Sequence, residues 1–135
     1  MYLLDTNIVS ELMRAVCDVQ VARRFDQHQA NCAVSVVVWD ELRFGLLCIP
    51  DSKRRTRLES AFSNLVVQLP VLDFVLRAAN WHAHERARLS NLGRKLPYVD
   101  GQIAATAAVN GLVLITRNVR DFEMYQGLVV EIWFD

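Results

Sequence analysis

The sequence predicts an α/β protein in which helices cover both faces of a mainly parallel central sheet of about five strands. Short apolar runs recur along the chain and are near-continuous in Val, Leu and Ile, a pattern typical of strands buried on both faces. Helical patterns separate these runs. The 135 residues, 53% hydrophobic and 22% charged, are enough for a proper core, so we expect one domain over residues 1–135.

The expected strands are short, and the expected helices lie between them. The strand runs are YLL (2–4), CAVSV (32–36), VVQLPVL (66–72), LVLIT (112–116) and LVVEI (128–132). Apolar residues at helical spacing predict helices over 8–14, around 21–28, over 36–47, from Ser52 to Val66, over 73–91 and over 101–111. This alternation of strands and helices indicates a parallel sheet that is covered on both sides.

Acidic residues follow several of the predicted strands. In an open parallel sheet, functional groups lie beyond the carboxyl ends of the strands. Asp5 closes the first strand, Glu41 falls in the second turn of the helix after the second strand, and Asp100 opens the Ala-rich helix. Asp121 comes shortly after the fourth strand. Each acid also has a local explanation, as a helix cap (Asp5, Asp100), a first-turn acid (Asp121) or a solvated residue (Glu41). Together they predict one acidic site at one edge of the sheet.

The chemistry of such a site follows from its charge. Clustered carboxylates repel one another unless a cation neutralises them, so the cluster points to a divalent metal. All-oxygen ligands favour a hard ion, and Mg²⁺ or Mn²⁺ fits better than Zn²⁺, which would want His or Cys nearby. His82 and His84 are not expected to form a metal pair, because residues two apart on a helix point to opposite sides. Hydrolysis of a phosphate ester is the expected reaction.

Four motifs carry a family resemblance. LLDTNIVSE, DELRFG, DGQIAATA and TRNVRDF, in this order and at these intervals, resemble the PIN-domain ribonucleases, and among them the VapC toxins of type II toxin-antitoxin pairs and the similar FitB. The resemblance covers nearly the whole chain. It implies a three-layer α/β/α sandwich and an Mg²⁺- or Mn²⁺-dependent endoribonuclease that arrests translation or growth. It also implies a cognate VapB-like antitoxin that blocks the site, operator DNA contacted only through that antitoxin, and a homodimer.

The resemblance assigns roles to individual residues. The family's metal-coordinating acids correspond to Asp5, Glu41 and Asp100, and its fourth catalytic acid corresponds to Asp121. In relatives such as FitB the position that matches Asn118 can itself be an acid, so Asn118 is expected to support the site beside Asp121. We expect the Thr116 hydroxyl in the same network.

The DELRFG motif contains two adjacent acids, Asp40 and Glu41. Neighbouring helix positions are about 100° apart, so both cannot face one ion. The E-L-x-x-G match selects Glu41, and Gly45 is expected to allow close helix packing.

Basic residues are candidates for contact with RNA or a protein partner. Lys+Arg and Asp+Glu both number 15, so any nucleic-acid surface must be local. One group, in the first turns of a helix where the helix dipole disfavours cations, consists of Arg54, Arg55 and Arg57. The second group precedes Asp100 in the sequence and consists of Arg86, Arg94 and Lys95. A solvated surface is the competing explanation for these residues.

Two alternative functions compete with the nuclease. A phosphatase with an Asp nucleophile would want a second acid two residues after Asp5, and Asn7 occupies that position. A non-catalytic, FitB-like subunit that acts only by binding its partner in a DNA-bound repressor complex is the second alternative. The three cysteines form no C-x-x-C pair, and no apolar run approaches the roughly 20 residues of a membrane span, so we expect a cytoplasmic protein without a membrane segment.

Overall fold

The computed structural model describes residues 1–134 and contains a parallel sheet in the order β3-β2-β1-β4-β5. The strands are β1 (Tyr2–Leu4), β2 (Cys32–Ser35), β3 (Val71–Leu72), β4 (Val113–Ile115) and β5 (Val130–Glu131). Every neighbouring pair is parallel. The prediction of a mainly parallel sheet of five strands is therefore confirmed.

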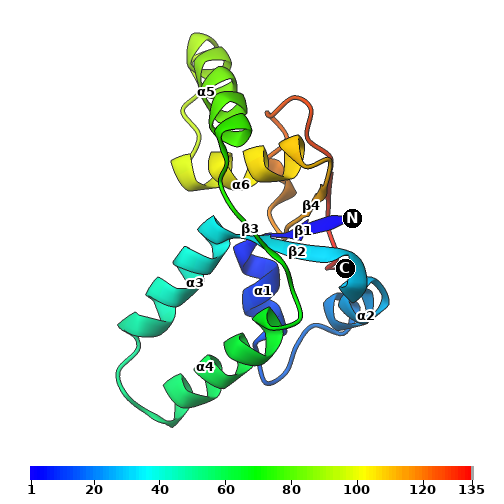
Figure 1. Cartoon of the computed structure of the whole chain (residues 1–135), viewed down its shortest axis with the longest axis vertical. Coiled ribbons are helices and arrows are strands. Elements are labelled where there is room, and N and C mark those ends of the chain that lie inside the picture. The colour runs from blue at the N-terminus through cyan, green and yellow to red at the C-terminus, as the bar shows by residue number, and fades with distance from the viewer. Residues whose placement is uncertain (135) are drawn as a thin grey trace.

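The helices lie in the connections between strands. They are α1 (Thr6–Leu12), α2 (Val19–His28), α3 (Val36–Cys48), α4 (Lys53–Val66), α5 (Leu76–Asn91) and α6 (Tyr98–Val109), with short 3₁₀ turns η1 (Gln29–Asn31) and η2 (Val119–Asp121). The chain runs from β1 to β2 to β3 in one direction and then crosses back to β4 on the other side of β1. Crossovers of the usual right hand therefore put the two sets of helices on opposite faces. Figure 1 shows α5 and α6 on one side of the sheet and α1 to α4 on the other, which confirms the three-layer α/β/α arrangement.

The core lies where the central strands meet both helical layers. All four residues of β2 are buried, and Leu3, Leu4, Leu114 and Ile115 have no exposed surface. Strands covered on both faces favour continuous apolar runs over alternation, so the apolar runs in the sequence predicted these strands. No helix within residues 1–134 combines the length and the apolar composition needed to cross a membrane.

Side-chain caps begin four of the helices. Asp5, Asp18, Ser35 and Ser52 each accept a hydrogen bond from a backbone N–H of the helix that follows. The cap of α1, Asp5, directly follows β1, and the cap of α3, Ser35, is the last residue of β2, so neither helix is preceded by a loop. A cap in this position necessarily lies at the carboxyl edge of the sheet, so local helix initiation also delivers the Asp5 carboxylate to that edge.

Two local predictions were wrong, and one alternative explanation does not hold. The run 66–72 forms a strand only at Val71–Leu72, since α4 continues to Val66 and then turns. The apolar stripe of α4 extends through the turn to Leu69, which is 5% exposed. Asp100 does not cap α6, because Pro97 holds that position and Asp100 lies in the first turn. Gly45 allows no close packing within the described chain, because a Cβ there would meet nothing within 4 Å.

Candidate active site at the carboxyl edge of the sheet

A cavity opens where the strand order reverses. The helices after β1 and those before β4 lie on opposite faces, so a crevice forms beyond the carboxyl ends of these two adjacent strands. The backbone closes the base of this crevice, where the Asp5 N–H donates to the Ile115 carbonyl at 2.9 Å. The resulting cavity, the acidic cavity, has a volume of about 600 Å³ and is lined by Asp5, Thr6, Asn7, Ser10, Glu11, Arg14, Glu41, Asp100, Arg117, Asn118, Asp121 and Phe122.

Asp5 is the most buried of the predicted acids, with 6% of its surface exposed. Its carboxylate caps α1 by accepting from the Thr6 N–H at 2.8 Å, and it also accepts from the buried Thr116 hydroxyl at 2.8 Å. The Asn7 amide lies 3.4 Å from the same carboxylate. Burial raises the pKa of Asp5, the two hydrogen bonds oppose that rise, and the nearby carboxylates of Glu41 and Asp121 add to it.

Glu41 reaches the cavity from the second turn of α3. Its carboxylate accepts from the Thr6 hydroxyl at 2.6 Å, so one residue of α1 contacts both Asp5 and Glu41. Asp40, the neighbouring acid, is exposed and is not among the residues that line the cavity. Of the two adjacent acids, Glu41 is the one that faces the site.

Asp100 enters from the opposite helical layer, on the first turn of α6. Burial raises the pKa of its carboxyl to about 6, and the charges of Asp5, Asp121 and Glu41 contribute to the rise. All four carboxylates line the acidic cavity, where Asp5 is buried, Asp100 is partly buried, and Glu41 and Asp121 are exposed. The structure therefore brings acids from four segments, far apart in the sequence, around one cavity.

Asp121 and Asn118 come from the turn after β4. Asp121 ends η2 and is exposed, and its backbone N–H donates to the Asn118 carbonyl at 3.0 Å. The Asn118 N–H donates to the Thr116 hydroxyl oxygen at 3.1 Å, and that hydroxyl donates to Asp5. Both Asn118 and Asp121 line the cavity, and Thr116 connects this turn to the Asp5 carboxylate.

The donor set suits a hard cation. Apart from the two arginines, the polar lining consists of carboxylate, amide and hydroxyl side chains, with no His or Cys among the lining residues of the described chain. Within residues 1–134, no three His, Cys, Asp or Glu side chains stand close enough to hold an ion in their present positions. An ion such as Mg²⁺ that keeps several of its waters requires only one or two direct carboxylate contacts, which this open arrangement can supply.

The predicted basic residues lie outside the acidic cavity. Arg86, Arg94 and Lys95 line a second cavity of about 900 Å³ between α5 and the start of α6, which we call the basic cavity. Arg55 is engaged within the chain, donating to Glu59 at 3.1 Å and to the Ile49 carbonyl at 3.2 Å. Arg54 and Arg57 are exposed on α4.

Sequence reasoning missed the two basic residues that do line the acidic cavity, Arg14 and Arg117. A usable signal was present for each. Arg117 directly follows the predicted strand at 112–116, and Arg14 stands three residues after Glu11, just beyond the end of the helix that Asp5 caps. Both positions belong to the same sheet edge as the acids.

Comparison with known proteins identifies the family. The family model of the PIN domain matches residues 2–127 of the sequence. The chain belongs to the PIN domain family. Within it, this PIN domain is 35% identical to the VapC ribonuclease Y4jK of Sinorhizobium fredii, over 91% of each chain. It is 32% identical to the tRNA(fMet)-specific endonuclease VapC of Shigella flexneri, over 98% of this chain and 97% of that one.

Solved structures agree with these sequence relatives. The PIN domain superposes with a TM-score of 0.85 on the DNA-bound VapBC structure from Salmonella typhimurium, at 28% identity and over 98% of this chain and 97% of that one. The resemblance to VapC-like PIN domains that the four motifs predicted is confirmed.

Proposed function

We propose that this VapC-like PIN domain is the ribonuclease toxin of a toxin-antitoxin pair and that it cleaves phosphodiester bonds within RNA. One observation carries the proposal: Asp5, Glu41, Asp100 and Asp121, from four distant segments, line a single cavity at the carboxyl edge of the sheet. Its relatives named VapC ribonuclease and tRNA(fMet)-specific endonuclease support RNA as the substrate class.

The proposal includes Mg²⁺ or Mn²⁺ as cofactor. The raised pKa values of Asp5 and Asp100 support it, because a carboxylate cluster of this kind is held in its charged form by a cation. Asp5, Glu41, Asp100 and Asp121 would hold the ion. When bound, such an ion lowers the pKa of water and neutralises charge on phosphate oxygens.

The remaining polar residues orient these acids. Thr116 donates to Asp5, and Thr6 bridges Asp5 and Glu41 with its backbone N–H and its hydroxyl. These bonds fix the carboxylate directions before substrate arrives, which avoids reorganisation during the reaction. Asn118 presents an amide at the mouth of the same cavity and is proposed to contact the substrate beside Asp121.

A cognate antitoxin is the proposed protein partner, with operator DNA bound through it, and the similar VapBC structure that is bound to DNA supports both. Helix α3 leaves apolar side chains exposed, including Phe44 at 67% and Leu47 at 56%, and Val67 just after α4 is 81% exposed, which supports a covering antitoxin or second copy. The purely partner-binding, FitB-like alternative is not favoured, because it leaves the costly clustering of four carboxylates without a purpose. Since RNA is the proposed substrate, the cytoplasm is the proposed location.

The test is RNA cleavage by the purified protein with Mg²⁺ and with EDTA. Asp100→Asn removes one charge and keeps the side-chain shape, and we expect it to lower the cleavage rate by about a thousandfold or more. Asp40→Asn is the matched control, because Asp40 is an exposed acid outside the cavity. Equal cleavage by the Asp100→Asn variant, or cleavage that persists in EDTA, contradicts the proposed site.

A further inference from the structure

Two arginines share the acidic cavity with the four acids. Arg14 lies just beyond the end of α1, and Arg117 lies two residues beyond the end of β4. Neither guanidinium is a counter-ion for the acids: of the ion pairs among residues 1–134, the only one that involves either arginine joins Arg14 to Glu11. Two positive charges therefore stand at the edge of a negative site without neutralising it.

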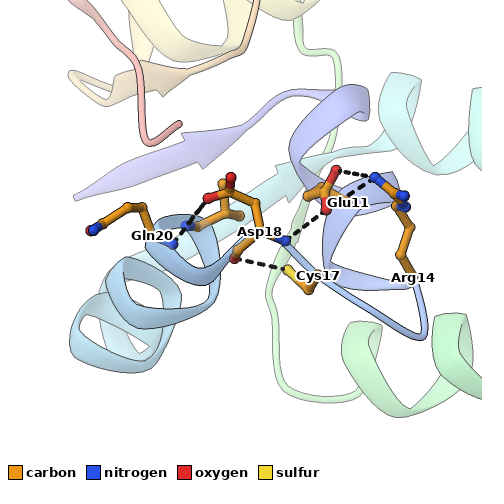
Figure 2. A network of polar contacts seen from close by, with 6 residues as sticks. Glu11, Arg14, Cys17, Asp18 and Gln20 are labelled. Atoms are coloured by element: carbon orange, nitrogen blue, oxygen red, sulfur yellow. Dashed lines mark hydrogen bonds and ion pairs between the residues drawn. The ribbon is translucent and has the colours of Figure 1, made fainter. Parts of the chain in front are cut away.

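Arg14 is held in place by a buried acid. Glu11 is 5% exposed and accepts from Arg14 Nη1 at 3.1 Å and from the backbone N–H of Asp18 at 2.8 Å. Figure 2 shows Glu11 between these two donors, with Asp18 in turn capping α2. The Arg14 side chain is 64% exposed, and its Nε and Nη2 make no hydrogen bond to any other part of residues 1–134. Arg14 is thus fixed at one nitrogen and has its remaining donors available.

Arg117 is held by an aromatic ring and by its own backbone. Its guanidinium lies 4.4 Å from the centre of the Phe134 ring, and its N–H donates to Asn7 Oδ1 at 3.0 Å. Asn7 also contacts Asp5, so the backbone of Arg117 is connected to the most buried acid of the site. The guanidinium makes no hydrogen bond with the part of the chain that the structure describes, so its donors too are available.

The two arginines also border a second recess. A pocket of about 230 Å³ shares Glu11, Arg14 and Arg117 with the acidic cavity and adds Val16, Cys17, Asp18 and Phe134. The shared residues make the two spaces neighbours. An extended chain that lies in the acidic cavity can therefore continue past the arginines into the recess.

We propose that Arg14 and Arg117 form a clamp that binds the RNA phosphate next to the phosphate being cleaved. The inference rests on the proposed function, because an RNA strand with one phosphate at the acids has its adjacent phosphate within the same cavity. A guanidinium matches two phosphate oxygens at once, and an arginine that is already anchored loses little entropy on binding. The clamp also attracts a polyanion to a site whose acids repel it.

The experiment measures binding separately from cleavage. Asp100→Asn protein, expected to be unable to cut, is titrated with a short fluorescein-labelled single-stranded RNA of mixed sequence at several NaCl concentrations and one low Mg²⁺ concentration. The slope of log affinity against log salt concentration is negative, and each lost phosphate contact should reduce its magnitude by about 0.7. Arg14→Gln and Arg117→Gln should each reduce RNA affinity by about tenfold and reduce the magnitude of the slope in part, and the double variant, which loses the one clamped phosphate, should reduce it by about 0.7 in all.

Controls separate the clamp from general effects. Arg23→Gln removes an equally charged, exposed arginine on α2, outside the acidic cavity, and should leave both slope and affinity unchanged. If Arg14→Gln unfolds because Glu11 loses its partner, Arg117→Gln tests the clamp alone, since its side chain makes no hydrogen bond within residues 1–134.

An unchanged slope in both clamp variants overturns the proposal. So does a loss of binding to labelled polyglutamate with RNA binding intact, which would assign the arginines to an acidic peptide. The cleavage assay with EDTA reports on the proposed function by itself, so failure of the clamp is distinguishable from failure of the nuclease.

Discussion

The acidic cavity and the basic cavity lie on either side of the first turn of α6, and they are built in opposite ways. Asp100 lines the first and Tyr98 the second. The acids of the first come from segments as far apart as residues 5 and 121, whereas the cations of the second, Arg86, Arg94 and Lys95, come from one short stretch. Of these acids Asp5 is buried and Asp100 is partly buried, their charges repel one another and those of Glu41 and Asp121, and only tertiary structure keeps the four together.

The electrostatic free-energy cost of the two charge clusters differs accordingly. The pKa of Asp100 is raised to about 6 by burial and by the other acids. In the basic cavity, Arg86 lies 4.7 Å over the Tyr98 ring, and Arg94 and Lys95 are exposed to solvent, where cations carry little penalty. A costly, long-range cluster indicates selection for chemistry, while an inexpensive local one is compatible with either binding or simple solvation.

After that of Asp100→Asn, the largest effect is expected within the acidic cavity, at its two candidates for the fourth group. Asp121→Ala removes a charge from the cluster and should lower RNA cleavage by about a hundredfold, while Asn118→Ala removes a neutral amide and should lower it by about tenfold. Single-turnover cleavage rates measure both. The reverse order would give Asn118 the main role and would leave Asp121 as an exposed acid of η2.

The next largest effect is expected on stability, at Gly101, which lies between the two cavities. A Cβ at Gly101 would lie 2.3 Å from His82 Nε2 and 3.1 Å from the Tyr125 hydroxyl, and His82 is 3% exposed. Gly101→Ala should therefore lower the free energy of unfolding by about 2–3 kcal/mol and Tm by about 10 °C. Thermal and urea unfolding measure both quantities.

The same substitution has a matched control in Gly45→Ala, where a Cβ meets nothing within 4 Å in the middle of α3. That variant should stabilise the protein by about 0.5–1 kcal/mol. Adding His82→Ala to Gly101→Ala should recover part of the lost stability, because it removes the atoms that clash. An undiminished loss in the double variant would show that the backbone, and not His82, requires glycine.

Stability of the metal-free protein should depend on pH in the direction set by Asp100. Its pKa is about 6 in the folded protein against 3.8 ordinarily, so the folded state disfavours the charged form. The contribution of Asp100 to the free energy of unfolding is therefore most favourable below about pH 4 and is lost as the pH rises through about 6. The change is about 1 kcal/mol after allowance for solvent screening.

Thermal unfolding in EDTA between about pH 4 and pH 7 measures this change. Asp100→Asn should flatten the pH dependence, and Mg²⁺ should stabilise the wild type more at the higher pH, where the acids are ionised. Equal stabilisation by Mg²⁺ at both pH values would argue against carboxylate ligands.

The smallest effect is expected in the basic cavity. Replacing Arg86, Arg94 and Lys95 together by Gln should weaken RNA binding by severalfold, since exposed cations contribute little each. Arg54→Gln with Arg57→Gln on α4 is a second exposed pair for comparison. An effect on RNA affinity as large as that of the acidic cavity would remove the functional contrast between the two regions.

Much of the fold was readable from local patterns. The near-continuous runs at 2–4, 32–36 and 112–116 predicted the central strands, because a strand covered on both faces buries every side chain. The run at 66–72 was misread because Val66 and Val67 favour a strand locally, whereas packing of α4 extends the helix to Val66. The cap explanation of Asp100 was open because an acid suits both the cap and the first turn of a helix.

The candidate site was only partly readable. Motif order pointed to the four acids, but it did not reveal that Arg14 and Arg117 share their cavity. The sequence distance from Arg14 to Arg117 spans most of the chain, and no local periodicity reports a contact of that range. The motif had already selected Glu41 over Asp40, and the structure adds the Thr6 hydroxyl that donates to its carboxylate.

By itself, then, the sequence determined the strands, the helices, the caps and the kinds of charged residue present, because these depend on neighbours a few positions away. The tertiary structure alone decided which charges share a space. It did so because the strand order reverses between β1 and β4, and that reversal, set by long-range packing of both helical layers, opens the crevice where Asp5, Asp100 and Arg117 meet.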